Sequence, residues 1–221
     1  MKIDILTLFP KLFESVFSES LIDRAQNKKI AAITIHNLRD WSIDKYKTVD
    51  DKPFGGGPGM VMKVDVVDRA LQSLPAGYKI LLTPQGQVFN QKIAQKLSSY
   101  KNLILICGHY EGYDERIREL IDEEISIGDY VLTGGEIPAM VIVDTIVRLL
   151  PGVVGKAASL TEESFSAGQL EYPQYTRPEN YQGKTVPPVL LSGNHKKIKQ
   201  WRQAEAEKRT KIRRPDLVNK H

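Results

Sequence analysis

The apolar run Leu103-Ile-Leu-Ile-Cys107 leads directly into the loop Gly108-His-Tyr-Glu-Gly112. A short apolar run that ends at a glycine is typical of a β-strand, because a helix needs a longer stretch with a 3.6-residue period. In open sheets of parallel strands, ligands bind at the loops that follow the carboxyl ends of the strands. This junction therefore predicts a strand of an α/β fold and, directly after it, a candidate binding loop.

The same pattern continues on both sides of this strand. Short apolar runs alternate with helix-period stretches over residues 1–150, which predicts an α/β fold with a mostly parallel sheet. The expected strands are residues 2–8, 31–37, 79–83, 102–107 and 124–127. The expected helices are one that opens at Pro10 and reaches Leu21, then 64–74, 91–97, 114–121 and a last one from 136 or 137 to 150, before Pro151 and Gly152.

The composition of the 221 residues is that of a globular protein, with 41% hydrophobic residues. The single cysteine excludes an internal disulfide and a zinc site built on several thiolates, and it indicates a reducing, cytoplasmic location. No apolar run reaches the roughly 18 residues of a spanning helix. The charged, strand-like N-terminus is not typical of a signal peptide. We therefore expect a cytoplasmic protein with no membrane partner.

Basic residues gather toward the C-terminal end. Residues 172–221 contain 12 basic and four acidic residues, a net charge of +8, whereas residues 1–171 carry −4. A basic helical unit at about 192–211 follows a proline-rich segment, and the stretch before that is rich in small and polar residues. We expect a first domain over 1–157, a linker over 158–171 and a helical second domain over 172–221. The charge favours a polyanionic partner, although a solvated lysine-rich helix would show the same pattern.

The densest glycine cluster is Gly55-Gly-Gly-Pro-Gly59. It lacks the Gly-Lys-Ser/Thr ending of a P-loop, and it lacks the third glycine and the preceding strand of a dinucleotide-binding motif. Both kinds of phosphate cradle are therefore disfavoured, and with them a Rossmann-type nucleotide enzyme. Because so many glycines in one loop are costly in chain entropy, we expect a functional loop here rather than a simple flexible turn.

Three glycine-containing loops follow predicted strands, at residues 83–86, 108–112 and 128–135. Their backbone N–H and C=O groups suit a small, flat, polar ligand such as adenine, so we expect them to form one pocket. Glu111 and Asp129 lie in these loops. Each carboxylate could bind a ribose hydroxyl, a cation or a metal, or could instead cap a helix or pair with an arginine.

Other kinds of chemistry find little support in the sequence. His109 is more typical of a surface or hydrogen-bonding residue than of a ligand, and the four histidines form no close cluster with Cys or Asp, so a transition-metal site is not expected. Ser126 lacks the Gly-x-Ser-x-Gly context of a nucleophile elbow. Cys107 ends an apolar strand, where a buried and inert thiol is expected.

Taken together, five motifs closely resemble those of the bacterial tRNA (guanine-N1)-methyltransferases, which modify guanine-37 beside the anticodon. The matching segments occur in order along the chain: Asp50-Asp51-Lys-Pro-Phe-Gly-Gly-Gly-Pro-Gly-Met60, Cys107-Gly-His-Tyr-Glu-Gly112, Ser126-Ile-Gly-Asp-Tyr-Val-Leu-Thr-Gly-Gly-Glu136, Tyr175-Thr-Arg-Pro-Glu179 and Pro187-Pro-Val-Leu-Leu-Ser-Gly-Asn-His195. The resemblance implies a SPOUT-type α/β methyltransferase domain with a deep trefoil knot. It also implies a homodimer with shared active sites, S-adenosylmethionine bound in the knot, and a basic helical C-terminal domain that binds tRNA.

The resemblance assigns roles to individual positions. The three loops become the cofactor site, and Glu111 could help to hold Mg²⁺ near the cofactor. Asp50, Gly57, Gly59 and Arg177 are implied contacts of the tRNA substrate. The implied cofactor-binding residues are Thr83, Pro84, Gly108, Tyr110, Glu111, Gly112, Ser126, Ile127, Gly128, Asp129, Tyr130, Val131, Leu132, Gly134, Gly135 and Pro138.

Two further residues are candidates for the catalytic step. The resemblance implies that Glu171, just before the Tyr175 motif, is the general base. Guanine N1 carries a proton at neutral pH, so a positioned carboxylate must accept it; facing both N1–H and the exocyclic amine, it would also select guanine over adenine. Negative charge then develops on O6, and Lys156 is the candidate cation that would stabilise it.

The sequence departs from the family at two points. Glu171 stands where most members have the shorter aspartate, which alters the reach of the base. The chain ends at His221, soon after Arg214, so a smaller tRNA grip is expected. A non-enzymatic RNA-binding protein stays open as an alternative, since it would keep the basic C-terminal region but would not need the glycine-rich pocket.

Overall fold

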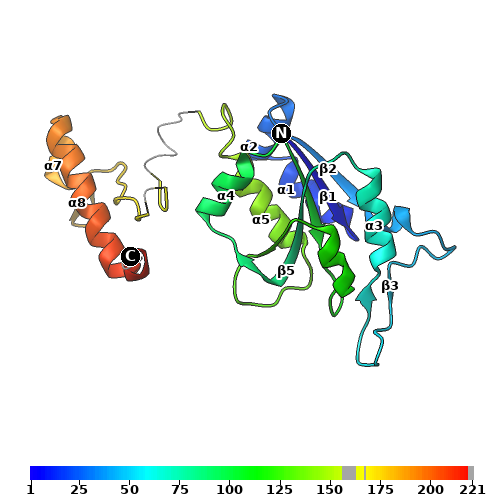
Figure 1. Ribbon diagram of the computed structural model, residues 1–221. Coiled ribbons are helices and arrows are strands. Elements are labelled where there is room, and N and C mark those ends of the chain that lie inside the picture. Colours follow the sequence, from blue (N-terminus) through cyan, green and yellow to red (C-terminus); the bar gives the residue numbers. More distant parts are fainter. Residues whose placement is uncertain (156–162, 167, 219–221) are drawn as a thin grey trace. The chain divides into compact units, whose positions relative to one another are not determined.

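The computed structural model describes residues 1–155, 163–166 and 168–218. The chain divides into two compact units, Met1–Gly155 and Lys156–His221, which we describe separately (Figure 1).

The first unit is built on a five-stranded parallel sheet. Its strands are β1 (Lys2–Thr7), β2 (Ala32–Asn37), β5 (Tyr78–Val88), β6 (Asn102–Cys107) and β7 (Glu123–Ser126), in the spatial order β2-β1-β6-β5-β7. Each of the five predicted strands is present, and the predicted α/β class with a parallel sheet is confirmed. Strand β6, which contains the apolar run 103–107, lies at the centre of the sheet and has the predicted bounds.

Side chains of β6 alternate between two hydrophobic cores, one on each face of the sheet. Leu103, Leu105 and Cys107 belong to the core under α1 (Glu14–Phe17), α2 (Ser20–Asn27), α4 (Gln91–Ser98) and α5 (Glu136–Val147). Ile104 and Ile106 belong to the core under α3 (Val64–Ser73) and the 3₁₀ helices η2 (Leu38–Trp41) and η3 (Glu115–Leu120). Figure 1 shows α3 on the opposite side of the sheet from the α1, α2, α4 and α5 layer. This period of two is what a strand covered on both faces requires.

Burial also settles the character of the single cysteine. Cys107 is fully buried, and this burial raises the pKa of its thiol, with a smaller contribution from the charge of Glu136. A protonated, inaccessible thiol is a poor nucleophile. The predicted burial of the thiol is confirmed.

Several predicted helices have different boundaries. The helix expected from Pro10 to Leu21 is divided into the 3₁₀ turn η1 (Pro10–Phe13), α1 and α2, because Glu19 is extended and Ser20 has a φ of +58°. The helix expected at 114–121 is the 3₁₀ helix η3. The last helix, α5, ends at Val147 rather than at 150.

The first candidate loop, residues 83–86, lies within a strand rather than after one. Strand β5 continues to Val88, and its pairing with β7 is irregular between Leu82 and Gln87. Pro84 explains this irregularity, because it has no N–H to continue the ladder of hydrogen bonds. The chain bulges at 83–86 and returns to the sheet, so that the predicted loop becomes a bulge.

The longest element in the described part of the second unit is one long helix. A short hairpin of β8 (Asn180–Tyr181) and β9 (Lys184–Thr185) is followed by α7 (Pro188–Leu191), α8 (His195–Arg213) and the 3₁₀ helix η4 (Pro215–Leu217). Helix α8 is the basic helix expected at about 192–211. Its N-terminus is capped by Asn194, whose side chain accepts a hydrogen bond from the N–H of Lys197. Within the described part of the chain, no helix is long and apolar enough to cross a membrane.

Candidate active site

Three segments, at residues 82–85, 108–113 and 125–135, meet with Pro138 in one cavity of about 260 Å³. They belong to or follow β5, β6 and β7, which are neighbours in the sheet, so the carboxyl ends of these strands reach the same edge. This volume lies just below the roughly 300–1,000 Å³ typical of small-molecule sites. Fifteen of the sixteen residues predicted to bind a cofactor line the cavity: Thr83, Pro84, Gly108, Tyr110, Glu111, Gly112, Ser126, Ile127, Gly128, Tyr130, Val131, Leu132, Gly134, Gly135 and Pro138.

Asp129 is the predicted residue that does not line the cavity. The N–H of Tyr130 donates to the carbonyl of Gly128 at 3.0 Å, which makes Asp129 the central residue of a tight three-residue turn. Six further residues line the cavity: Leu82, Gln85, His109, Tyr113, Ile125 and Thr133. Gln85, His109 and Thr133 lie within the loops predicted to form one pocket, and the other three lie next to a predicted residue, so slightly wider boundaries would have included them.

The third loop is held directly against the second. The N–H of Gly135 donates to the carbonyl of Gly108 at 2.8 Å. A Cβ at Gly135 would lie 2.6 Å from the Cα of Cys107, closer than side chains approach a neighbouring backbone. Glycine is therefore required for the chain to enter α5 this close to β6.

Ser126 has a structural role at the start of the third loop. Its hydroxyl accepts a hydrogen bond from the N–H of Gly128 at 3.2 Å and donates to the carbonyl of the same residue at 3.1 Å. The Tyr130 hydroxyl donates to the carbonyl of Ile127 at 3.1 Å. The side chains of Ser126 and Tyr130 thus hold the backbone of the third loop in one conformation.

A buried polar chain lies beside the second loop. The Thr7 hydroxyl donates to Oε1 of Glu136 at 2.8 Å, and both residues are buried. The other carboxylate oxygen, Oε2, lies 3.8 Å from Nδ1 of His109, a buried atom with no hydrogen-bond partner in the described part of the chain. The His109 ring packs between Phe9 and Tyr110, with ring centroids 4.9 and 5.2 Å away. His109 is thus part of the cavity wall, as expected for a residue of the second loop.

The glycine-rich loop connects two short paired strands, β3 (Asp50–Asp51) and β4 (Val61–Met62). Its end is attached to the second cavity loop, since Glu111 N–H donates to the Met60 carbonyl at 3.1 Å and Met62 N–H donates to the Gly112 carbonyl at 3.0 Å. Gly59 has a φ of +73°, and a Cβ there would collide with the Glu111 side chain. The structure therefore places Gly59 directly beside the cavity residue Glu111.

Asp50 lies near the second cavity loop, since its carboxylate interacts with Tyr110 of that loop. Burial raises the pKa of the Tyr110 hydroxyl, and the negative charge of Asp50 adds to this rise, while Arg39 opposes it. Two of the predicted substrate contacts, Asp50 and Gly59, are thus neighbours of Tyr110 and Glu111. Gly57 lies farther out in the same loop, where a Cβ would approach only Pro53.

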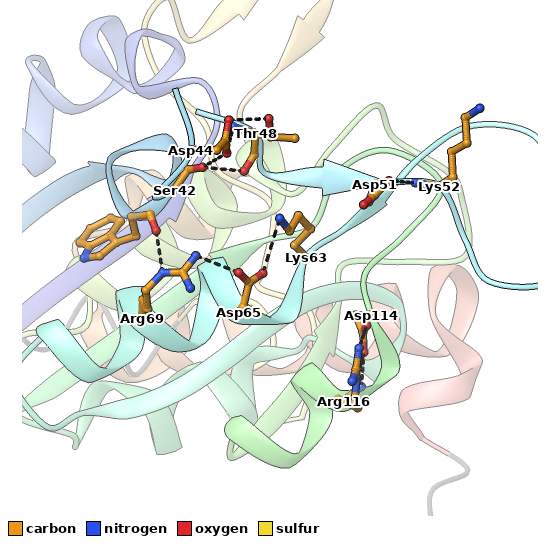
Figure 2. Close-up of polar contacts among 11 residues, drawn as sticks. Ser42, Asp44, Thr48, Asp51, Lys52, Lys63, Asp65, Arg69, Asp114 and Arg116 are labelled. Atoms are coloured by element: carbon orange, nitrogen blue, oxygen red, sulfur yellow. Dashed lines mark hydrogen bonds and ion pairs between the residues drawn. The ribbon is translucent and has the colours of Figure 1, made fainter. Parts of the chain in front are cut away.

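Polar contacts hold the residues before and after the glycine-rich loop, in the ranges 41–48 and 63–69 (Figure 2). Asp65 pairs with Arg69 at 3.0 Å and with Lys63 at 4.0 Å, while Arg69 also donates to the carbonyl of Trp41. Asp44 accepts hydrogen bonds from Ser42 and Thr48, and the Ser42 contact is the main cause of its lowered pKa. The residues on both sides of the glycine-rich loop are therefore held by side-chain contacts, whereas Phe54 within the loop is fully exposed.

The catalytic candidates belong to the other unit or lie outside the described residues. Glu171 is half-buried, and its backbone N–H donates to the Ser164 hydroxyl at 3.1 Å. Arg177 is exposed. Lys156 lies outside the described residues. Among the residues that the structure describes, no group of three or more His, Cys, Asp or Glu side chains could hold a metal ion.

Comparison with known proteins identifies the family of the chain. The model of the family described as tRNA (Guanine-1)-methyltransferase TrmD matches residues 1–220. The chain belongs to this methyltransferase family. This confirms the resemblance seen in the five motifs.

Full-length relatives in the family are closely similar. The chain is 56% identical over 222 residues to the tRNA (guanine-N(1)-)-methyltransferase of Dictyoglomus turgidum, covering 100% of this chain and 91% of the relative. Proteins of the same name from Staphylococcus carnosus and Bacillus subtilis are 56% and 55% identical, and the match covers 100% of this chain and 92% and 93% of theirs. The motifs found from the sequence alone are therefore those of a family that matches this chain throughout.

Proposed function

We propose that the protein transfers a methyl group from S-adenosylmethionine to N1 of guanine-37 in tRNA. The observation that carries this proposal is one cavity lined by three segments. Two of them, 108–113 and 125–135, contain family motifs, and the third, 82–85, lies in the irregular part of β5. Its wall is rich in glycine and in accessible backbone groups, which suits the edge of an adenine ring. The −4 charge of residues 1–171 is compatible with a cationic sulfonium ligand.

The residues of the cavity fit this cofactor. The fifteen predicted residues that line the cavity would hold it, and we retain Asp129 as a contact of its ribose or its cationic part. When bound, S-adenosylmethionine supplies an electrophilic methyl group. Glu111 would help to hold Mg²⁺ together with oxygens of the substrates, since one or two carboxylates commonly suffice for this ion in nucleotide-type sites.

Glu171 is proposed as the general base. Its carboxylate would accept the N1 proton while N1 attacks the methyl carbon, and it would face the exocyclic amine that distinguishes guanine from adenine. Lys156 would stabilise the negative charge that develops on O6. Asp50, Gly57, Gly59 and Arg177 would contact the tRNA.

The larger architecture follows the same family. We propose a catalytic domain over residues 1–157 with a deep trefoil knot, a linker over 158–171 and a helical tRNA-binding domain over 172–221. Two chains would form a homodimer with shared active sites. A tRNA substrate and a single reduced cysteine fit a cytoplasmic enzyme.

The test is a methyl-transfer assay with labelled S-adenosylmethionine and unmodified tRNA transcripts, in the presence of Mg²⁺. A transcript with guanines at positions 36 and 37 is expected to accept label, and the same transcript with adenine at position 37 is expected to accept none. Equal labelling of both, or labelling of neither, would refute the proposal. Absence of S-adenosylmethionine binding in a calorimetric titration would favour the non-enzymatic RNA-binding alternative.

A further inference from the structure

The segment that carries Glu171 is attached to the basic helix α8. The backbone N–H of Leu170 donates to the hydroxyl of Thr210 at 2.9 Å. That hydroxyl donates in turn to the carbonyl of Ala206, one turn earlier in α8, at 2.7 Å. Thr210 is only 2% exposed. Its hydroxyl thus acts both as acceptor for the segment and as donor to the helix.

The residues on both sides of Glu171 are each held by a contact with α8, one by a hydrogen bond and the other by a cation–π contact. Leu170 is attached through Thr210, and the ring of Tyr172 lies under the guanidinium of Arg202, with the Cζ atom 4.6 Å from the ring centroid. Between them, the N–H of Glu171 donates to the Ser164 hydroxyl. Three successive residues are therefore fixed by three separate contacts, two of them with α8.

The spacing along α8 explains why one helix can hold this segment and still bind a polyanion. Arg202, Ala206 and Thr210 are four residues apart, so they lie on one face of the helix. Ala206 and Thr210 are the buried residues of that face. The lysines of the helix are exposed and available to phosphate groups: Lys196, Lys197, Lys199, Lys208 and Lys211.

We propose that Thr210 is a positioning residue for Glu171. Through Leu170, its hydroxyl sets the place of the base on the same helix whose exposed lysines bind the tRNA backbone. One rigid element then grips the substrate and presents the carboxylate to it. This inference rests on the proposed function, and in particular on Glu171 as the base.

The test compares Thr210→Val with Thr210→Ser in single-turnover methyl transfer, with saturating tRNA and S-adenosylmethionine. Valine keeps the shape but removes the hydroxyl, so the Leu170 N–H loses its acceptor; serine keeps the hydroxyl. We expect Thr210→Val to slow transfer by about 10- to 100-fold, the scale of a small misplacement of a catalytic group, and Thr210→Ser by less than about threefold. Dissociation constants for tRNA and S-adenosylmethionine should stay within about twofold, on the same reasoning.

Further variants separate positioning from loss of structure. Ser164→Ala leaves α8 intact, removes the acceptor for Glu171 N–H, and is expected to slow transfer by about tenfold. Thr185→Val makes the matched change at an exposed threonine of the same unit and should have no effect. Lys208→Ala with Lys211→Ala should weaken tRNA binding, because it removes two charges that would face phosphate groups.

Each outcome bears on one proposal. A wild-type rate in Thr210→Val, or a loss in Thr210→Val that is matched by a loss of tRNA affinity, would overturn the positioning role. If Thr210→Val does not fold, Thr210→Ala, which also removes the hydroxyl, takes its place and is judged in the same way. Failure of the proposed function would look different, because the wild-type protein would then give no methylated product or Glu171→Ala would turn over normally.

Discussion

The cavity of the first unit and the Glu171 segment of the second are built in different ways. The cavity is lined by segments that belong to or follow three neighbouring strands, with the backbone of the third loop packed closely on the second at Gly135 and a hydrophobic core on each face of the sheet. The Glu171 segment is attached to a surface helix, and within the described part of the second unit only Ala206 and Thr210 are buried. The first site therefore depends on the packing of its backbone, whereas the second depends on a few individual side chains.

The largest effect is expected from Glu171→Ala. If the second unit supplies the base and the first binds the cofactor, this variant should lose methyl transfer by about 10²- to 10⁴-fold, the usual contribution of a general base. Binding of S-adenosylmethionine should be unchanged in a calorimetric titration. Glu179→Ala, at an exposed glutamate of the same unit, is the control. Turnover of Glu171→Ala at the wild-type rate would remove Glu171 as the base.

At Gly135, by contrast, we expect a substitution to weaken binding of the cofactor. In Gly135→Ala the added methyl group would meet the backbone of Cys107, so the third loop must move away from the second. Overpacking of this kind costs about 1–3 kcal/mol of folding free energy, and we expect a marked loss of S-adenosylmethionine affinity, measured by calorimetry. Gly155→Ala, where a Cβ would meet nothing within 4 Å, should bind normally. Normal binding by Gly135→Ala would contradict a cavity held by close backbone packing.

A smaller effect on stability is expected at Thr7, whose hydroxyl contacts Glu136 beside the second cavity loop. Thr7→Val removes the hydroxyl that donates to the buried Glu136, and an unsatisfied buried polar group costs about 1–3 kcal/mol. We expect a lower urea midpoint for the first unit, and Thr7→Ser should recover most of the loss. An unchanged midpoint in Thr7→Val would show that Glu136 does not depend on this hydrogen bond.

The smallest effect is expected at Asp114, which caps η3 and accepts hydrogen bonds from Arg116. Asp114→Ala should cost about 1 kcal/mol at neutral pH. Arg116 lowers the pKa of Asp114 in the folded state, so this stabilisation is present above the unfolded pKa of about 3.9 and is lost as pH falls through the lower, folded value.

Urea unfolding at several pH values measures this difference. Wild-type and Asp114→Ala proteins should differ at pH 7 and converge in acid. Glu119→Ala, at an exposed position of the same 3₁₀ helix, should have little effect at either pH. A difference in unfolding free energy that grows as pH falls would contradict a lowered pKa of Asp114 in the folded protein.

The fold and the cavity were largely predictable from the sequence because both follow from short-range patterns. The apolar run at 103–107 marks a strand, and a glycine loop directly after a strand marks a ligand-binding edge. The bulge in β5 does not follow from the sequence, because Pro84 is typical of the end of a strand, whereas the chain resumes pairing at Gln87. The division of the first helix depends on the backbone of Ser20, which periodicity does not encode.

Contacts between residues far apart in the chain were beyond such patterns. His109 and Glu136 are brought together by the packing of α5 on β6, and Thr7 joins them from β1, 129 residues away from Glu136 in sequence. Thr210 and Leu170 are 40 residues apart. Nothing in the local sequence of either residue indicates that partner, so these contacts could be found only from the structure.

The most direct test of the proposed methyl transfer is to map the methylated nucleotide by mass spectrometry after incubation of wild-type protein with S-adenosylmethionine and an unmodified tRNA transcript. We predict N1-methylguanine at position 37 and at no other position. A methyl group on another atom or another nucleotide, or the absence of any product, would contradict the proposed activity.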